Sequence, residues 1–206
     1  MPTQPRGLRR SEGKGKGVFA TQRIQPGTVI ILEEPALTVA YPAKEHDIID
    51  EFQALDMALK CQLLQHSEGA QTKSSSIVRK FWANCFSSRD AKKRAVLCSI
   101  SRVNQSCVPK ASVRDDVMPN KPDMEALTAN KEIGAGEEVC IDYLEFSEAL
   151  PTHVRRRAKL SWYAFVCTSQ VCSSPPYFSQ LSDARRLVTG PLCNAIAGLD
   201  QTTCCT

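Results

Sequence analysis

The hydrophobic and polar positions of this chain change their period twice, which predicts strands, then helices, then strands again. Short apolar runs between turn residues predict early strands at Val18–Ala20, Val29–Leu32 and Ala36–Tyr41, the first two joined by a Pro-Gly turn. Two later strands are predicted at 126–130 and 139–143, with a glycine-rich turn between them. Because strands and helices do not alternate regularly, this order excludes a doubly wound α/β fold.

A helical period separates the two groups of strands. Between Ile48 and Leu64 apolar residues recur at steps of three and four, which is typical of an amphipathic helix. A second helical patch is expected around 77–83, after a serine-rich loop. We therefore expect a helical insertion over residues 46–98 within a domain that is otherwise β-rich.

The two ends of the chain differ in composition from its middle. Residues 1–15 are polar and rich in glycine, lysine and arginine, and we expect a loose arm there. A basic helix is predicted over 152–160, and a last helix over 180–188 follows a Ser-Ser-Pro-Pro linker. The 206 residues suffice for one domain over 1–172 and a short C-terminal tail over 173–206.

Composition and charge exclude several classes of function. The chain is 42% hydrophobic and its net charge of +4 is not clustered, so direct nucleic-acid binding is not expected. No apolar run is long enough to span a bilayer, and the N-terminus lacks the apolar core of a secretory signal. We therefore expect an intracellular protein, cytoplasmic or nuclear, whose ten cysteines are buried thiols, metal ligands or incidental residues.

Candidate chemistry is concentrated in a few short segments. Val103–Pro109 reads VNQSCVP, and residues 129–143 read ANKEIGAGEEVCIDY and end on a tyrosine at a strand end. Tyr163–Cys172 reads YAFVCTSQVC and combines two aromatic rings with two thiols. The glycine run at 13–17, GKGKG, precedes a strand rather than a helix, which argues against a phosphate-binding loop.

In this order and spacing the segments resemble those of the SET-domain family. Residues 15–20 resemble its N-terminal loop and strand, and Arg102–Ala111 resembles its Asn-His-Ser-Cys-x-Pro-Asn signature. The stretch that ends in Tyr143 resembles the strand with the family's catalytic tyrosine. Trp82–Phe86, WANCF, resembles an Asn-x-Phe segment of the SET-and-MYND branch and of related fungal proteins.

The resemblance covers residues 13 to about 172 and implies a fold that sequence periodicity alone does not specify. The implied fold is mainly β with an α insertion (α+β), with several small antiparallel sheets and a C-terminal pseudoknot, a rare threaded topology. Residues 1–172 would form the SET-like domain and 173–206 a short post-SET-like tail. A MYND module is not expected, because the insertion lacks paired Cys-x-x-Cys spacing.

The family's activity implies methyl transfer from S-adenosylmethionine to a protein lysine, with the two substrates entering from opposite faces. The transfer is an in-line displacement that requires a neutral amine, and an apolar aromatic channel favours that form. The resemblance assigns the catalytic role to Tyr143 and the channel lining to Tyr163 and Phe165. It assigns cofactor binding to a further set of residues: Gly15, Lys16, Gly17, Asn84, Asn104 and Gln105.

A zinc site is the second cofactor that the resemblance raises. The family's Cys-x-Cys-x-x-Cys motif and its signature cysteine together supply four thiolates, but Ser169 replaces one of these cysteines here. Three candidate ligands remain: Cys107, Cys167 and Cys172. Zinc could bind with a water or with help from Cys204 or Cys205, or be lost and leave buried thiols.

Departures inside the signature keep a second function open. Gln105 stands where the family has histidine, and Lys110 stands where it has asparagine. One hypothesis is therefore a lysine methyltransferase that uses Tyr143. The alternative is a repurposed SET fold that acts on a small molecule, for example in a cyclisation of fungal secondary metabolism, or serves as a binding module. Outside the family context Asn84 could simply end its helix, and Tyr143 could be an ordinary buried tyrosine.

Overall fold

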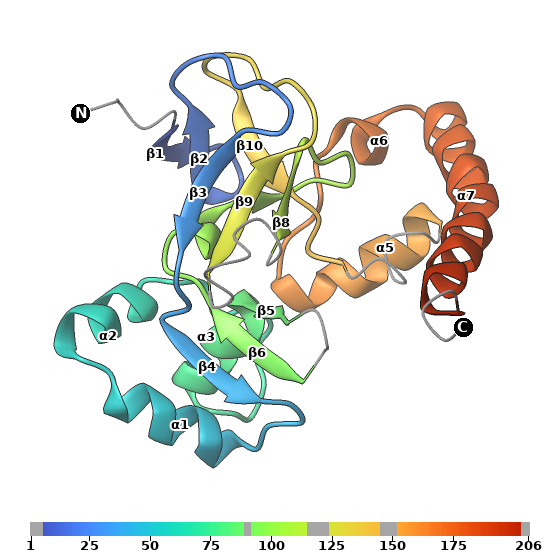
Figure 1. Ribbon diagram of the computed structural model, residues 1–206. Coiled ribbons are helices and arrows are strands. Elements are labelled where there is room, and N and C mark those ends of the chain that lie inside the picture. The colour runs from blue at the N-terminus through green and yellow to red at the C-terminus, as the bar shows by residue number, and fades with distance from the viewer. Residues whose placement is uncertain (1–5, 89–91, 115–123, 145–151, 203–206) are drawn as a thin grey trace.

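Three small sheets and two groups of helices make up the protein (Figure 1). The computed structural model describes residues 6–88, 92–114, 124–144 and 152–202, with side chains up to Thr189. The helices of the insertion lie in the lower left of Figure 1, beside the lowest of the three sheets, and the C-terminal helices lie to the right. The predicted α+β arrangement of several small, mostly antiparallel sheets is confirmed.

The first sheet joins the N-terminus of the chain to its two most informative motifs. Its order is β1 (Arg6–Ser11), β2 (Gly15–Ala20), β10 (Glu138–Ile141) and β7 (Asn104–Gln105). β1 and β2 form an antiparallel hairpin, so the expected loose arm over 1–15 is wrong for residues 6–15. Leu8, Arg9 and Arg10 in the middle of β1 are all exposed, so this strand has no apolar run from which it could be predicted.

The other two sheets each contain three strands. One has the order β3 (Val29–Glu33), β9 (Glu125–Ala129) and β8 (Ala111–Arg114). The other has the order β4 (Leu37–Ala40), β6 (Lys93–Val96) and β5 (Cys85–Ser87). The predicted strands at 18–20 and 29–32 both exist, but they belong to different sheets. The Pro-Gly turn between them therefore connects two sheets and does not close a hairpin.

The insertion contains three short helices in place of the expected two. They are α1 (Glu45–Ala54), α2 (Met57–Leu64) and α3 (Ser76–Asn84). The chain breaks after α1 because Leu55 is extended and Asp56 caps α2, its Oδ1 accepting from Leu59 N at 2.8 Å. The helices end at Asn84, and the last part of the predicted helical insertion over 46–98 forms β5 and β6.

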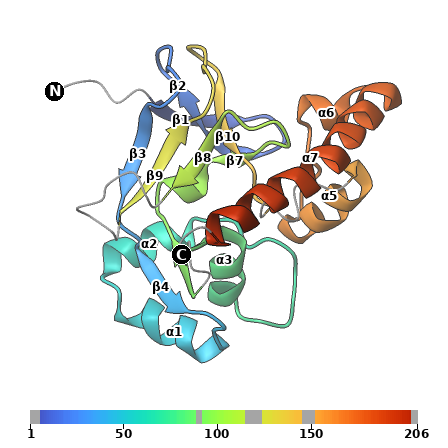
Figure 2. The same cartoon turned by 45° about the vertical axis from the view of Figure 1, so that its right-hand side comes forward.

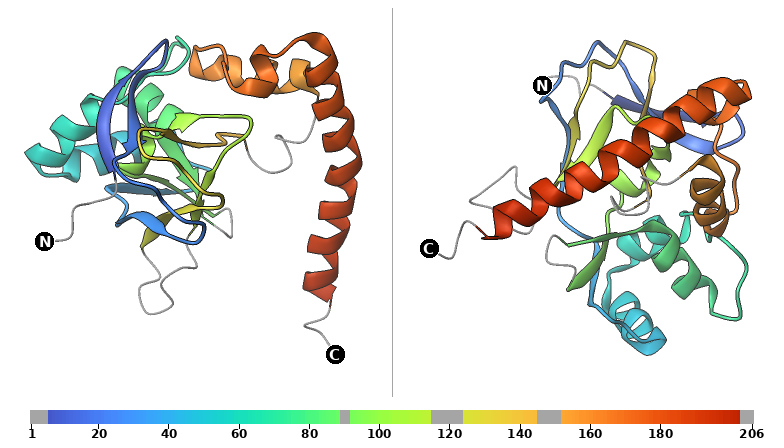
Figure 3. Two further views of the ribbon diagram at one scale, coloured as in Figure 1. Left: turned by 90° about the horizontal axis from the view of Figure 1, so that it is seen from above. Right: turned by 90° about the vertical axis from the view of Figure 1, so that its right-hand side faces the viewer.

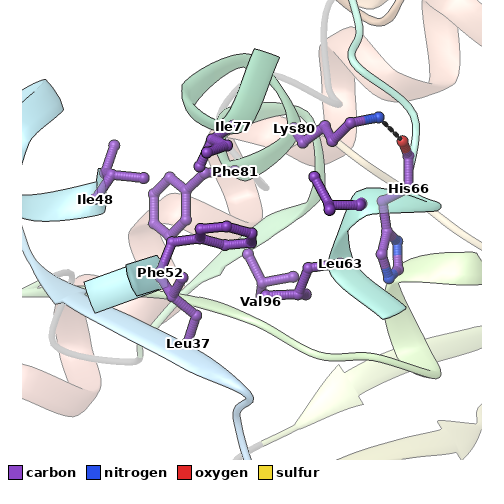
Figure 4. Close-up of a pocket in the computed structure, with 10 residues that line it drawn as sticks. Leu37, Ile48, Phe52, Leu63, His66, Ile77, Lys80, Phe81 and Val96 are labelled. Atoms are coloured by element: carbon purple, nitrogen blue, oxygen red, sulfur yellow. Dashed lines mark hydrogen bonds between the residues drawn. The ribbon is translucent and has the colours of Figure 1, made fainter. Parts of the chain in front are cut away.

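The insertion has its own hydrophobic core, separate from the core between the sheets. Figure 4 shows Ile48, Phe52 and Phe81 converging on β4 and β6, where Leu37 and Val96 complete the cluster. The void among them measures only about 20 Å³, room for roughly one water molecule. This region is therefore a packed core and not a ligand site.

The C-terminal segment forms more helix than its sequence predicts. It contains α5 (His153–Leu160), the 3₁₀ turn η2 (Ser161–Tyr163), α6 (Gln170–Ser173) and α7 (Pro176–Thr202). Figures 2 and 3 show α7 as one long rod, which replaces the shorter helix expected over 180–188. None of the described helices is both long and apolar enough to cross a membrane.

The long helix α7 contacts the body of the protein through polar side chains. Asp183 and Arg186 form its hydrogen bonds to the body, whereas Tyr177, Leu181 and Val188 are exposed. This arrangement is the reverse of an ordinary amphipathic surface helix. Its position is consequently fixed by a few directional bonds.

The separate core of the insertion gives a direct test of the packing. Ile48 on α1 is fully buried, so Ile48→Ala should lower the free energy of unfolding by roughly 3 kcal/mol through lost contacts and a new cavity. Met57 on α2 is 73% exposed, and Met57→Ala should change stability by less than about 0.5 kcal/mol. Urea unfolding followed by circular dichroism measures both. Equal losses in the two variants would contradict the packing described.

Candidate functional site

A cavity of about 720 Å³ lies between the β1–β2 turn, the insertion and the C-terminal segment. Its wall contains every residue that the sequence assigned to cofactor binding or catalysis, with one exception: Gly15, Lys16, Asn84, Asn104, Gln105, Tyr143, Tyr163 and Phe165. These residues come from positions up to 150 apart in the chain. The fold thus brings the separate motifs to a single place.

The exception, Gly17, is buried in β2 beneath the cavity wall. A Cβ added there would overlap Glu138 Oε1 and lie 2.7 Å from Asn104 Nδ2. The structure therefore gives Gly17 a different role from the predicted contact with a cofactor. Its missing side chain allows β2 to approach Glu138 and Asn104 closely.

Asn104 is held by a carboxylate that the sequence did not single out. Its Nδ2 donates to Glu138 Oε1 at 2.7 Å and to the carbonyl of Lys16 at 3.3 Å. The other oxygen of Glu138 pairs with Lys14 Nζ at 3.3 Å. No described residue donates to Asn104 Oδ1, so this oxygen is available as an acceptor on the cavity wall.

The side chain of Gln105 crosslinks the signature to the end of β10. Its Nε2 donates to Asp142 Oδ1 at 3.0 Å, and its Oε1 accepts from the backbone N–H of Tyr143. Burial raises the pKa of Asp142 although Gln105 and the Leu144 amide both donate to its carboxylate. The glutamine that replaces the family's histidine therefore positions Tyr143. Its side-chain amide bonds to protein atoms and is not directed at a ligand.

Lys110, the second departure from the signature, is paired with a carboxylate. Lys110 Nζ lies 2.6 Å from Glu137 Oε1 and 2.8 Å from Glu137 Oε2. Partial burial opposes ionisation of Glu137, but the bonds from Lys110 and the Gly134 amide hold its pKa below the usual value. The added charge at Lys110 is thus matched by a neighbouring carboxylate.

Three aromatic rings meet at one end of the cavity. The ring centroid of Tyr143 lies 5.0 Å from that of Tyr163 and 6.1 Å from that of Phe165. Ala164 has a left-handed backbone with φ of 58°, which turns the chain between the two C-terminal rings. Tyr143 Oη donates to the carbonyl of Val103 at 2.8 Å, and burial raises its pKa further above neutrality.

A second cavity, of about 650 Å³, adjoins the first at this aromatic cluster. The two cavities share Tyr143 and Tyr163, together with Asn84. The second is lined elsewhere by further aromatic side chains: Tyr41, Trp82 and Phe86. The phenol of Tyr143 therefore lies where a ligand in one cavity could meet a ligand in the other.

A buried histidine joins the insertion to the first cavity. Asn84 Nδ2 donates to the carbonyls of Ser67 and Lys80, each at 2.7 Å, and Lys80 Nζ donates to the carbonyl of His66 (Figure 4). A further side-chain hydrogen bond joins His66 and Asn84. Desolvation, and then the charge of Arg102, lower the pKa of His66 to about 4.

The three candidate metal ligands form a compact cluster under the aromatic rings. The sulfurs of Cys107, Cys167 and Cys172 all lie within 4.8 Å of one another, and the first two are 3.7 Å apart. Tetrahedral zinc with Zn–S bonds of about 2.3 Å places sulfurs about 3.8 Å apart, so this spacing alone suits the metal. Cys204 and Cys205 lie outside the described residues.

The surroundings of the thiols do not suit a closed zinc site. Ser169 accepts a hydrogen bond from Cys167 at 3.2 Å, and the described residues contribute no fourth His, Cys, Asp or Glu ligand. The guanidinium of Arg156 is fully buried, lies beside Cys107 and donates to Asp183 at 3.1 Å. A structural site normally has four protein ligands, so the three thiols and a neighbouring cation do not fit one.

The lowered pKa of His66 predicts an acid-dependent loss of stability. Its folded pKa of about 4 lies below its usual 6.5, so the unfolded chain takes up the proton first as the pH falls. The stabilising contribution is present above pH 6.5 and is lost as the pH falls from 6.5 through about 4, by roughly 3 kcal/mol.

Urea unfolding at a series of pH values measures this loss. His66→Gln should flatten the stability profile over that range, whereas His46→Gln on the exposed surface of α1 should leave it as in the wild type. A wild-type slope that survives in His66→Gln would assign the acid dependence to other groups.

The sequence pattern of the SET domain matches residues 15–144. A Danio rerio protein named protein-lysine N-trimethyltransferase SMYD5 is 36% identical over 85 residues, which are 41% of this chain and 19% of that protein. A solved candidate histone methyltransferase of Plasmodium falciparum gives a TM-score of 0.42 at 13% identity, covering 69% of this chain and 96% of that one.

The SET-domain match extends from the glycine run at 15–17 through the signature to Tyr143, so it includes the residues that line the first cavity except those at its two ends, such as Gly13, Tyr163 and Phe165. The family and fold predicted from these motifs are both confirmed. Because the match covers well over half of the sequence, the chain belongs to the SET-domain family.

Proposed function

We propose that this chain is an S-adenosylmethionine-dependent methyltransferase that acts on a protein lysine. The observation that carries the proposal is the pair of cavities that adjoin at Tyr143 and Tyr163. A methyl transfer needs two substrates aligned across a short gap, and most of its catalysis is positioning. Membership of the SET-domain family and the similarity to a named lysine methyltransferase both support this reaction class.

The first cavity is the proposed cofactor site. The side-chain oxygen Oδ1 of Asn104 is available there as a hydrogen-bond acceptor, and the rings of Tyr143 and Phe165 close one end of the cavity. Aromatic faces attract a sulfonium cation through their quadrupoles. S-adenosylmethionine, when bound, supplies an electrophilic methyl group on that sulfonium. Gly15 and Lys16 line the same cavity from the β1–β2 turn and are proposed to contact the cofactor through the backbone.

The second cavity is the proposed route for the lysine side chain. Its aromatic rings and the carboxylates of Glu125 and Asp142 attract an ammonium group and would guide the lysine side chain towards Tyr143, where the amine must lose its proton before it reacts. The hydroxyl proton of Tyr143 is engaged by the carbonyl of Val103, so the phenol oxygen offers only lone pairs to the cavity. An N–H of the lysine amine can donate to these lone pairs, which would direct the nitrogen lone pair towards the methyl group.

The functional domain is proposed to extend past the matched region to Cys172. Tyr163 and Phe165 complete the aromatic end of the first cavity, and Cys167 packs beneath them in one buried cluster. A unit ending at residue 144 would lack this wall. The 1–172 domain and the 173–206 tail inferred from the sequence remain the proposed division, with most of the tail folded as α7.

Removal of the phenol oxygen tests the proposed role of Tyr143. Tyr143→Phe should reduce methyl transfer by roughly 100-fold, because the amine loses its acceptor, while the affinity for S-adenosylhomocysteine stays close to that of the wild type. Transfer of a radiolabelled methyl group to lysate proteins measures the first quantity, and calorimetry measures the second. Tyr177→Phe on the exposed surface of α7 is the matched control.

Each outcome of that assay distinguishes between the open hypotheses. Label on a protein lysine that disappears in Tyr143→Phe supports the proposal. Full transfer by the variant contradicts the role of the phenol. Label that the wild type places only on small molecules in the lysate contradicts the lysine acceptor and favours a repurposed SET fold.

Arg102 is the proposed partner of the cofactor's carboxylate. It lines the first cavity, and within the described residues its guanidinium has neither a hydrogen bond nor an ion pair, whereas Lys14 is matched by Glu138. Arg102→Leu should weaken S-adenosylhomocysteine binding by roughly 10-fold or more, the value of one charge-assisted bond. Calorimetry with methylthioadenosine, which lacks the carboxylate, should show little change.

Two controls separate this role from a general loss of structure. Arg102→Lys should recover part of the affinity because it retains a cation, and Arg185→Leu on the exposed side of α7 should bind both ligands like the wild type. Parallel losses for S-adenosylhomocysteine and methylthioadenosine in Arg102→Leu would contradict a contact with the carboxylate.

A further inference from the structure

Four segments of the chain meet at the buried thiols. Cys107 belongs to the signature, Cys167 follows Phe165, Arg156 comes from α5, and Asp183 comes from the first turns of α7. The thiols pack in one cluster with Leu144 and Leu160, and this cluster contacts Tyr143, Tyr163 and Phe165 from below. Whatever holds the four segments together therefore also holds the aromatic end of the first cavity.

Arg156 connects both sides of this junction. Its side chain is fully buried, and its guanidinium lies beside Cys107 and donates to Asp183 Oδ1 at 3.1 Å. Asp183 Oδ2 also accepts from the backbone N–H of His153 at 2.8 Å, which fixes the first turn of α5. A second arginine of α7, Arg186, donates to the carbonyl of Cys107. The bonds run continuously from the signature to α5 and α7.

Cationic side chains already surround the thiols. Arg156 lies beside Cys107 and is paired with Asp183, and Arg186 adds a second guanidinium at the carbonyl of Cys107. Zinc bound to these thiols would place a dication beside the two guanidinium groups. Buried charge without compensation is costly, and two cations bound to one sulfur repel each other.

The described part of α7 leads away from the thiols. From Arg186, which contacts the signature, α7 continues to Thr202, a rise of about 24 Å along the helix axis. The left view of Figure 3 shows that this part of α7 runs away from α5 and α6. The direction of the helix thus carries the chain away from the thiols.

We propose that the guanidinium of Arg156 replaces a structural zinc ion and competes with any metal for the same thiols. Arg156, Cys107 and Asp183 form a clamp, the Arg156 clamp, which holds the C-terminal helices on the signature. Arg156 is thus a positioning residue for Tyr163 and Phe165, to which it is connected through Cys107 and Cys167. The clamp does not depend on the activity proposed above, since it concerns only how the aromatic wall is held.

Metal content is the first test of the clamp. Protein expressed with added zinc, purified without chelator and analysed by plasma mass spectrometry should contain far less than one zinc per chain. Its melting temperature should be the same with and without EDTA. One zinc per chain that survives gel filtration, with a melting temperature that EDTA lowers, would overturn the proposal.

Removal of the guanidinium is the second test. Arg156→Met should lower the melting temperature by roughly 10 °C, because Asp183 and Cys107 lose their shared buried partner. The near-ultraviolet circular dichroism of the tyrosines should weaken in the folded variant, which a loss of stability alone would not produce. Arg157→Met, at the neighbouring exposed position of α5, should melt like the wild type. Unchanged melting and dichroism in Arg156→Met would contradict the clamp.

Restoration of the fourth thiol is the sharpest test of competition. Ser169→Cys alone should remain nearly free of zinc, because the guanidinium still occupies Cys107. The double variant Ser169→Cys with Arg156→Met should bind one zinc per chain, and zinc should raise its melting temperature well above that of Arg156→Met. Stoichiometric zinc in Ser169→Cys alone, or none in the double variant, would contradict competition between the guanidinium and the metal.

Discussion

The parallel pairing of β7 with β10 is the constraint on which the candidate site depends. It sets Asn104 beside Cys140 and Gln105 beside Ile141, so the signature and the strand leading to Tyr143 share one register. Side-chain hydrogen bonds between the two strands reinforce that register. Asn104 donates to Glu138, and Gln105 donates to Asp142 and accepts from the Tyr143 amide. A slip by one residue would turn each of these side chains to the other face and separate the proposed cofactor contacts from the tyrosine.

The departures from the family signature are understandable in this setting. The amide of Gln105 donates to Asp142 and to the sulfur of Cys107, and its oxygen accepts from the Tyr143 amide just after β10. The buried arginine of α5 likewise supplies the cation that a metal supplies in the four-thiolate arrangement, at the place where Ser169 has removed a ligand. The substitutions at positions 105 and 110 are compatible with an intact site because both side chains are paired with protein groups.

The sequence predicted which motifs meet at the site better than it predicted the strand pairing, helix ends and polar contacts that hold them there. The rings of Tyr143, Tyr163 and Phe165 meet as expected, because the family resemblance relates residues that are distant in the chain. The sequence pattern did not predict the strand at 6–11, the helix break at Asp56 or the polar contact face of α7. Their stabilisation comes from pairing, a cap and buried ion pairs, which apolar periodicity does not record. Glu138 and His66 were missed for the same reason, since tertiary contacts alone distinguish them from other polar residues.

The central claim is that two substrates meet at Tyr143 from two adjoining cavities. A crystal structure of the protein with S-adenosylhomocysteine tests it most directly. The account predicts the ligand in the first cavity, with its amino-acid or ribose groups near Asn104 and its sulfur directed at the cluster of Tyr143 and Tyr163. Ligand density in the second cavity, or a sulfur directed away from Tyr143, would contradict the account.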